Sequence, residues 1–148
     1  MSVHTSESFA PRANAAGEVA YHLIWGTKCR YKMFQQPRLY QACEASLRSA
    51  AQRHGLTILE LSVMPDHVHC VVACPPRVSA AEAARLLKGA SAYDAFRFEP
   101  RFRLRYPRGA LWARHYFVRS VGAADLETVR EYVRTDNDPR QLTLDAYN

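Results

Sequence analysis

The chain has 148 residues, of which 48% are hydrophobic, and it carries a formal net charge of +6. This length favours a single domain, and the absence of any apolar run of about 18 residues argues against a membrane span. The basic balance suits a polyanionic partner such as nucleic acid. Residues 1–17 contain no secretory signal, so we expect a soluble cytoplasmic protein with a flexible N-terminal tail.

The first half of the chain predicts a strand, a helix and a hairpin. Side chains alternate with period two over residues 19–25, as they do in a strand. Over residues 37–54 the apolar residues recur at helical spacing, and Gly55 supplies a stop signal. Two short runs rich in aliphatic and β-branched residues follow, at 56–63 and 67–74. The sequence Met-Pro-Asp between these runs favours a turn, and so a hairpin.

The second half predicts a helix, a loop, a strand and a last helix. Ser79 is suited to cap a helix over residues 80–88, because the glutamate three residues further on completes a capping box. Residues 98–109 are irregular, contain two prolines and predict a long functional loop. A strand over residues 116–121 and a helix over residues 124–135 complete the pattern.

The order of these elements is strand, helix, strand, strand, helix, strand, helix. Two β-α-β halves of this kind form a ferredoxin-like (RRM-like) antiparallel sheet, covered by helices on one face and open on the other. The sequence therefore predicts an α+β fold with an additional C-terminal helix.

The cysteines give no sign of a disulfide framework or a zinc site. The chain has four of them, and they form no CxxC pair and no zinc-finger spacing. We expect reduced thiols, as in a cytosolic protein, at Cys29, Cys43, Cys70 and Cys74.

His67 and His69 form a His-x-His pair on the strand predicted over residues 67–74. Because side chains alternate along a strand, both imidazoles project from one face. Such a pair can hold a divalent metal ion, with oxygen ligands in the remaining positions. The alternative is a pair of solvent-facing histidines on a half-exposed strand, since so short a motif often matches by chance.

Tyr132 and Asp136 are four residues apart at the end of the last predicted helix. Residues at this spacing share a helix face, so a phenol and a carboxylate can face the same site. One group could attack a substrate while the other binds a metal. In the alternative interpretation Asp136 is solvated, and Tyr132 flanks an apolar stripe formed by Leu126, Val129 and Val133.

Residues 97–119 combine seven arginines with aromatic residues, against the single acid Glu99. Guanidinium groups bind phosphates, and aromatic faces stack unpaired bases at about 1–3 kcal/mol each. The alternative is a solvated basic loop whose aromatic residues belong to the core. The candidate nucleic-acid contacts, from this segment and from nearby basic positions, are Lys28, Arg30, Lys88, Arg101, Arg103, Arg105 and Trp112.

Five segments occur in an order that is typical of one family. They are YHLIWGTK at 21–28, VMPDHVHCVV at 63–72, LLKGASA at 86–92, LWARHYFVRSVG at 111–122 and VREYVRTD at 129–136. With these segments the chain resembles the single-tyrosine transposases of single-strand insertion sequences, which belong to the His-hydrophobe-His (HUH) nucleases. The most specific segment is MPDHVH, in combination with YHLIWGTK and the tyrosine downstream.

The resemblance implies a role for each candidate catalytic residue. His67 and His69 would bind Mg²⁺ or Mn²⁺, and Tyr132 would be the nucleophile. Asp136 lies where the family usually places glutamine or glutamate as a third metal ligand. Aspartate is also an oxygen ligand but is shorter by one methylene, so this position departs from the family pattern.

The resemblance also implies a function. A catalytic domain over residues 18–138, between an N-terminal tail and a C-terminal tail at 139–148, would bind hairpins at the ends of a mobile element. It would cleave and rejoin single-stranded DNA through a 5′-phosphotyrosine, without a nucleotide cofactor. The expected assembly is a homodimer in which the tyrosine helix packs against the partner's histidine pair. Two alternatives stay open: a domesticated relative that acts on chromosomal palindromes, and a non-catalytic module that binds single-stranded nucleic acid.

Overall fold

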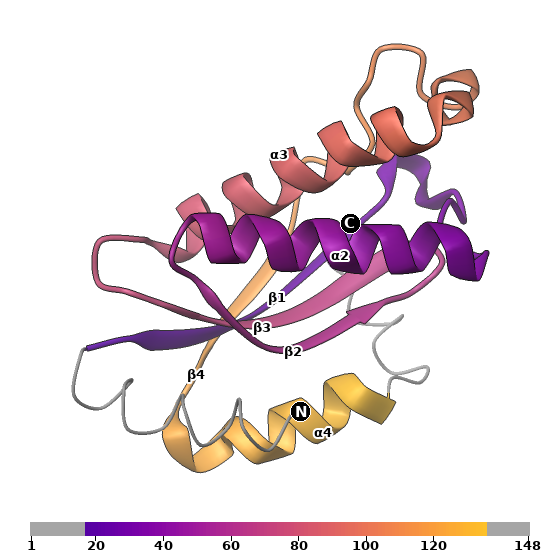
Figure 1. Cartoon of the computed structure of the whole chain (residues 1–148). Coiled ribbons are helices and arrows are strands. Elements are labelled where there is room, and N and C mark those ends of the chain that lie inside the picture. The colour runs from indigo at the N-terminus through magenta and orange to yellow at the C-terminus, as the bar shows by residue number, and fades with distance from the viewer. Residues whose placement is uncertain (1–16, 136–148) are drawn as a thin grey trace.

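The computed structural model describes residues 17–135, which form an antiparallel sheet between two layers of helices (Figure 1). The strands are β1 (Val19–Gly26), β2 (Thr57–Val63), β3 (His67–Cys74) and β4 (Phe117–Val121). The helices are α2 (Pro37–Arg53), α3 (Ala80–Phe98) and α4 (Leu126–Thr135). Short 3-10 turns lie at Lys28–Arg30, Pro100–Leu104 and Ala123–Asp125. None of the helices within residues 17–135 has the length and apolar character that a membrane span requires.

The strands lie in the order β2-β3-β1-β4, and every neighbouring pair is antiparallel. Two β-α-β halves that place β1 and β3 in the centre give this order, which is the ferredoxin-like arrangement. The predicted α+β fold with a ferredoxin-like sheet is therefore confirmed.

The two central strands of the sheet, β1 and β3, are buried on both faces. All eight residues of β3 are buried, and alternation directs Val68, Cys70 and Val72 into the core beneath α2 and α3. His67 and His69 occupy the opposite face. We expected that face to be open, but α4 covers it (Figure 1), because the apolar side chains of α4 pack against β2 and β3.

The helices over the first face begin and end at the expected signals, with one exception. α2 starts at Pro37, whose missing N–H costs nothing at that position, and stops before Gly55, which has a φ of +73°. The Ser79 hydroxyl caps α3 by accepting a hydrogen bond from the Glu82 N–H at 3.0 Å. α3 then continues through Gly89 to residue 98, ten residues further than predicted, because its buried face packs along α2.

The segment between α3 and β4 is anchored to the core, although its sequence predicts a loop. Trp112 is buried, and its indole N–H donates to the Ser91 hydroxyl at 3.0 Å. The Trp112 ring also stacks on Phe34, with a centroid distance of 5.5 Å. The Tyr106 hydroxyl donates to the Lys28 carbonyl at 2.7 Å. These contacts fix the basic segment against the turn that follows β1.

α4 is held on the sheet by an apolar cluster and a buried ion pair. Leu126 and Val133 of α4 pack in one cluster with Val71 of β3. The guanidinium of Arg130, which is only 1% exposed, donates to the Glu60 carboxylate on β2 at 3.2 Å. A buried charge of this kind depends on its partner, so α4 has a defined position over the sheet.

Candidate active site

Three imidazoles meet on the face of the sheet that α4 covers. The ring centroids of His67 and His69 are 5.1 Å apart, as expected for neighbours on one face of a strand. His22 of β1 brings a third ring, with its centroid 5.3 Å from that of His69. All three side chains are buried. The His-x-His pair therefore lies in an enclosed site and not on a solvent-facing strand.

Asp66 orients the first histidine of the pair. The Nδ1–H of His67 donates to the Asp66 carboxylate at 2.8 Å, and Arg30 donates to the second carboxylate oxygen at 3.1 Å. Burial alone would raise the pKa of the Asp66 carboxyl, but the hydrogen bond from His67 and the charge of Arg30 outweigh it and hold that pKa below its usual value. The carboxylate thus stays ionised, and because it can only accept, it fixes His67 with its proton on Nδ1.

Tyr132 lies beside this cluster. Its ring centroid is 6.4 Å from that of His69 and 6.3 Å from that of His22, and both pairs meet edge to face. The tyrosine is 37% exposed, so its ring can be reached from solvent. The apolar contacts of α4 and the Arg130–Glu60 pair set this position. Residues that are 63 positions apart in the sequence, His69 and Tyr132, thereby share one site.

The two histidines are chemically suited to be part of a metal-ligand set. Since Nδ1 of His67 is bonded to Asp66, Nε2 is the atom of that ring that would bind a metal ion. Within residues 17–135 no group of three or more His, Cys, Asp or Glu side chains is arranged to hold one. Asp136, the predicted third ligand, lies outside the described residues. Two imidazole donors suit a divalent ion whose other positions are filled by oxygen ligands.

One of the candidate basic residues, Arg30, contacts the site directly, and two more lie near it. Arg30 donates a hydrogen bond to Asp66, which in turn accepts one from His67 of the His-x-His pair. Lys28 belongs to the same exposed turn. The guanidinium of Arg105 lies over the Tyr31 ring at 4.3 Å, which brings the segment after α3 against that turn. These residues form a basic surface that begins at the edge of the active site.

Arg101 and Arg103 extend the same segment. Both are exposed; Arg101 lies 3.4 Å from the Glu99 carboxylate, and Arg103 lies over the Phe96 ring at 4.7 Å. Exposed charges of this kind can turn toward a phosphate at little cost.

Two other candidates for nucleic-acid contact have structural roles. Trp112 is part of the core, so its ring is not available for stacking on bases. The Lys88 ammonium donates to the carbonyls of Ala113 and Arg114 at 2.8 and 3.3 Å. Partial burial lowers the pKa of Lys88. Both residues help to hold residues 111–116 in place.

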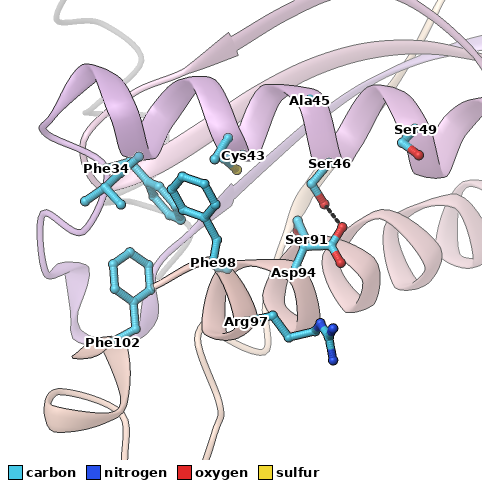
Figure 2. A pocket seen from close by; sticks show the side chains of 13 residues that line it. Phe34, Cys43, Ala45, Ser46, Ser49, Ser91, Asp94, Arg97, Phe98 and Phe102 are labelled. Atoms are coloured by element: carbon cyan, nitrogen blue, oxygen red, sulfur yellow. Dashed lines mark hydrogen bonds between the residues drawn. The ribbon is translucent and has the colours of Figure 1, made fainter. Parts of the chain in front are cut away.

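A groove of about 520 Å³ lies between α2 and α3 (Figure 2). Its walls are mainly apolar and include Phe34, Phe98 and Phe102, and the Ser46 hydroxyl donates to Asp94 across it at 2.6 Å. α2 and α3 lie on one side of the sheet and α4 on the other (Figure 1), so the sheet separates this groove from the histidines beside Tyr132 of α4. The groove is therefore a separate feature from the candidate active site.

Two residues of the site were not predicted from the sequence as functional. His22 lies on β1, two residues before Ile24, which pairs with His69 of β3. Only this strand pairing brings His22 beside His69. Asp66 precedes the His-x-His pair directly, and this adjacency was the available signal for it. A carboxylate next to a metal-binding histidine is a common outer partner.

Comparison with known proteins assigns the chain to a family. The family model described as "Transposase IS200 like" matches residues 15–136. The chain belongs to the IS200-like transposases. This transposase is 29% identical to the ISDra2 transposase TnpA of Deinococcus radiodurans over 121 residues, which are 82% of this chain and 86% of that protein. It is 25% identical to the transposase of insertion sequence element IS200 from Salmonella typhimurium, over 77% of this chain and 74% of the relative.

Solved structures agree with this family. The transposase superimposes on the crystal structure of a Deinococcus radiodurans protein assigned as a transposase, with a TM-score of 0.65 and 30% identity over 80% of this chain and 90% of that one. A REP-associated tyrosine transposase bound to a REP hairpin has the same fold, with a TM-score of 0.55 and 13% identity over 78% of this chain and 64% of that one. This transposase is thus a DNA-cleaving and strand-transferring enzyme of DNA recombination, in a family that is generally metal-dependent.

Proposed function

We propose that this transposase binds hairpins at the ends of a mobile element and cleaves and rejoins single-stranded DNA there, with Tyr132 as nucleophile. One observation carries the proposal. The Tyr132 ring lies 6.4 Å from that of His69, although the two residues come from different elements on the same face of the sheet. A nucleophile and a metal-binding pair must lie this near to each other to act on one phosphate.

The reaction is a pair of phosphoryl transfers. The Tyr132 oxygen attacks the scissile phosphorus and loses its proton, while the bond between phosphorus and the 3′ oxygen breaks and that oxygen takes up a proton. The products are a 5′-phosphotyrosine and a free 3′-hydroxyl. A different 3′-hydroxyl then attacks the phosphotyrosine and restores the tyrosine. Since the bond energy is conserved in the covalent intermediate, rejoining requires no nucleotide cofactor.

His67 and His69 would bind Mg²⁺ or Mn²⁺ in this reaction, with Asp136 as a third ligand. The ion would polarise the scissile phosphate and stabilise the charge that develops on its oxygens. Imidazole ligands favour Mn²⁺ more than an all-oxygen site would. Asp66 accepts a hydrogen bond from Nδ1 of His67, so Nε2 is the atom through which His67 would hold the ion.

The single-stranded DNA would approach over the basic surface at the edge of the site. Arg101, Arg103 and Arg105 are exposed there, and Lys28 and Arg30 continue that surface toward Asp66. Arginine forms bidentate hydrogen bonds to phosphate oxygens, which suits binding to the DNA backbone independently of the base sequence. Hairpin binding is extended to this chain from the REP-associated relative, whose structure contains a REP hairpin.

The proposed assembly is a homodimer with two active sites. Small residues at 122–124 connect β4 to α4, so α4 can lie on its own sheet or on that of a partner. An exchange of identical elements preserves their contacts, so the site has the same geometry in both arrangements. Mixing the His67→Ala/His69→Ala variant with Tyr132→Phe distinguishes them. Exchanged helices restore one active site per heterodimer, whereas sites built within single chains leave heterodimers inactive.

The proposal is tested by trapping the covalent intermediate on a single-stranded hairpin substrate with a nick beyond the cleavage site. The wild type should form a protein–DNA adduct that depends on a divalent metal, and Tyr132→Phe should form none while its hairpin affinity stays within a few-fold. Tyr93 on α3 is 64% exposed and provides the matched control, Tyr93→Phe, which should form the adduct normally. An adduct in Tyr132→Phe would refute the assignment, and no adduct in the wild type would indicate a binding module.

A further inference from the structure

We propose that His22 is a positioning residue that sets the tautomer of His69, and with it the ring nitrogen that His69 offers to a metal ion. The inference rests on the proposed function, because it takes His69 as a metal ligand. Its basis is a hydrogen bond between two buried imidazoles. Nε2 of His22 lies 3.0 Å from Nδ1 of His69. The two side chains are only 3% and 0% exposed.

Two neutral imidazoles can form this bond in only two ways. In the first, Nδ1–H of His69 donates to Nε2 of His22, and the Nε2 atom of His69 carries a lone pair. In the second, Nε2–H of His22 donates to Nδ1 of His69, so the proton of His69 is on Nε2. A metal ion needs a lone pair, so only the first arrangement lets His69 bind it through Nε2.

His67 shows the same arrangement with a different partner. Asp66 only accepts hydrogen bonds, so it fixes the proton of His67 on Nδ1 without ambiguity. His22 can either accept or donate at Nε2, so its control of His69 depends on its own tautomer. The two histidines of the pair thus have different outer partners, a carboxylate for one and an imidazole for the other.

The geometry assigns His22 to orientation and not to metal binding. Its Nε2 atom is engaged with His69, and the three imidazoles form no metal-binding group among residues 17–135. The His22 ring is also fixed by its neighbours, since it meets the rings of Phe117 and Tyr132 edge to face at 6.3 Å each. A His22 ring fixed in this way can determine the orientation of the His69 ring.

Three substitutions separate this role from simple packing. His22→Gln places an amide oxygen at about the reach of Nε2 and so restores an acceptor. His22→Asn carries the same amide at the shorter reach of Nδ1 and is the matched control. His22→Met fills much of the space but offers no comparable acceptor.

The first readout is the ¹⁵N NMR signature of the imidazoles in the metal-free protein, at a pH of about 9, well above the ordinary histidine pKa of about 6.5. The wild type and His22→Gln should show His69 with its proton on Nδ1. In His22→Asn and His22→Met that preference should be lost, while His67 keeps its tautomer in all four proteins because Asp66 is unchanged.

The second readout is Mn²⁺ affinity, measured by calorimetric titration without DNA. Loss of an outer partner typically weakens metal binding by about 10–100-fold. We expect that loss in His22→Asn and His22→Met and an affinity within a few-fold of the wild type in His22→Gln. Thermal unfolding of each variant shows whether it is folded before the comparison is made.

Each outcome decides the inference. Wild-type His69 with its proton on Nε2 overturns it, as does a folded His22→Met in which His69 still carries its proton on Nδ1, whatever its Mn²⁺ affinity. If a variant does not fold, the tautomer of His69 in the wild-type protein alone decides whether the inference holds. A wild type that has the Nδ1–H tautomer but does not bind Mn²⁺ contradicts the proposed metal site while supporting the role of His22 in orienting His69.

Discussion

The two faces of β3 are equally buried but differ in chemistry. Toward α2 and α3 the strand presents Val68, Cys70 and Val72, which belong to the main apolar core. Toward α4 it presents His67 and His69 at one end, and apolar residues that pack against α4 at the other. Burial therefore does not distinguish a structural face from a functional one in this protein. The distinguishing features are the polar atoms on the face and their partners.

α4 contacts both the apolar end and the histidine end of the sheet face that it covers. Leu126 and Val133 pack on the apolar end of that face, and Tyr132 lies beside the histidines. The position of Tyr132, the proposed nucleophile, therefore depends on packing contacts, whereas the core beneath α2 and α3 supports the sheet. Substitutions on the two faces should accordingly change different measurements.

The largest expected effect is on the histidine face. His67→Ala or His69→Ala should reduce cleavage by more than about 100-fold, because loss of an outer partner alone often costs 10–100-fold in metal sites. Val68 lies between them on β3 and faces the core, so Val68→Ala should lower the free energy of unfolding by about 2 kcal/mol and leave the cleavage rate of the folded protein nearly unchanged.

These variants are compared by single-turnover cleavage of hairpin DNA with Mg²⁺ or Mn²⁺, at a temperature at which all are folded. Unchanged cleavage in either histidine variant would remove that residue from the metal site. A large loss of cleavage in folded Val68→Ala would mean that the two faces are not separable.

The next effect concerns the ion pair that holds α4. Arg130→Ala removes a buried guanidinium and its hydrogen bond to Glu60 and should lower the free energy of unfolding by about 1–3 kcal/mol. Arg134 lies 3.5 Å from the same carboxylate but is exposed, so Arg134→Ala should cost less than about 1 kcal/mol. Urea unfolding measures both, and equal losses in the two variants would contradict the importance of burial.

A smaller effect is expected on the salt dependence of DNA binding when the basic surface is changed. Each phosphate contact to single-stranded DNA adds about 0.7 to the slope of log affinity against log salt. Replacing Arg101, Arg103 and Arg105 by glutamine should therefore flatten the slope by about 2. The charge-matched control replaces three arginines elsewhere, Arg53, Arg77 and Arg85, and should leave the slope unchanged. Fluorescence anisotropy at several salt concentrations checks this, and an equal change in both variants would place the DNA path elsewhere.

The smallest effect is expected from alkylation of the cysteines. Burial raises the pKa of Cys43 and Cys70 to about 12 and that of Cys74 to about 11, so these thiols stay protonated at pH 8 and react slowly. Cys29 is exposed. Iodoacetamide should modify Cys29 alone and leave folding unchanged. Mass spectrometry after brief labelling tests this, and early modification of Cys70 would show that the core face opens readily.

Much of the fold was predictable because the sheet has a clear period. The predicted strand over residues 67–74 matches β3, and the predicted strand over residues 56–63 exceeds β2 by one residue. α3 was predicted too short, because Gly89 resembles a helix breaker. Its packing along α2 outweighs the cost of about 1 kcal/mol that glycine carries in a helix.

Predictions for the site were limited by contacts between distant residues. The pairing of the histidines on one face follows from local spacing, and so it could be predicted. The inward position of Trp112 depends on a hydrogen bond to Ser91, and the position of α4 depends on Arg130 and Glu60. The role of His22 likewise depends on the pairing of two strands. None of these contacts leaves a periodic pattern in the sequence.

Peptide mapping of the trapped adduct shows whether Tyr132 is the residue that becomes covalently linked to DNA. Trypsin cleavage after Arg130 and Arg134 releases residues 131–134, whose only tyrosine is Tyr132. We expect to find the mass of the 5′-phosphorylated oligonucleotide on this peptide. A nucleotide on the peptide that contains Tyr93, or on any other peptide, would contradict this expectation.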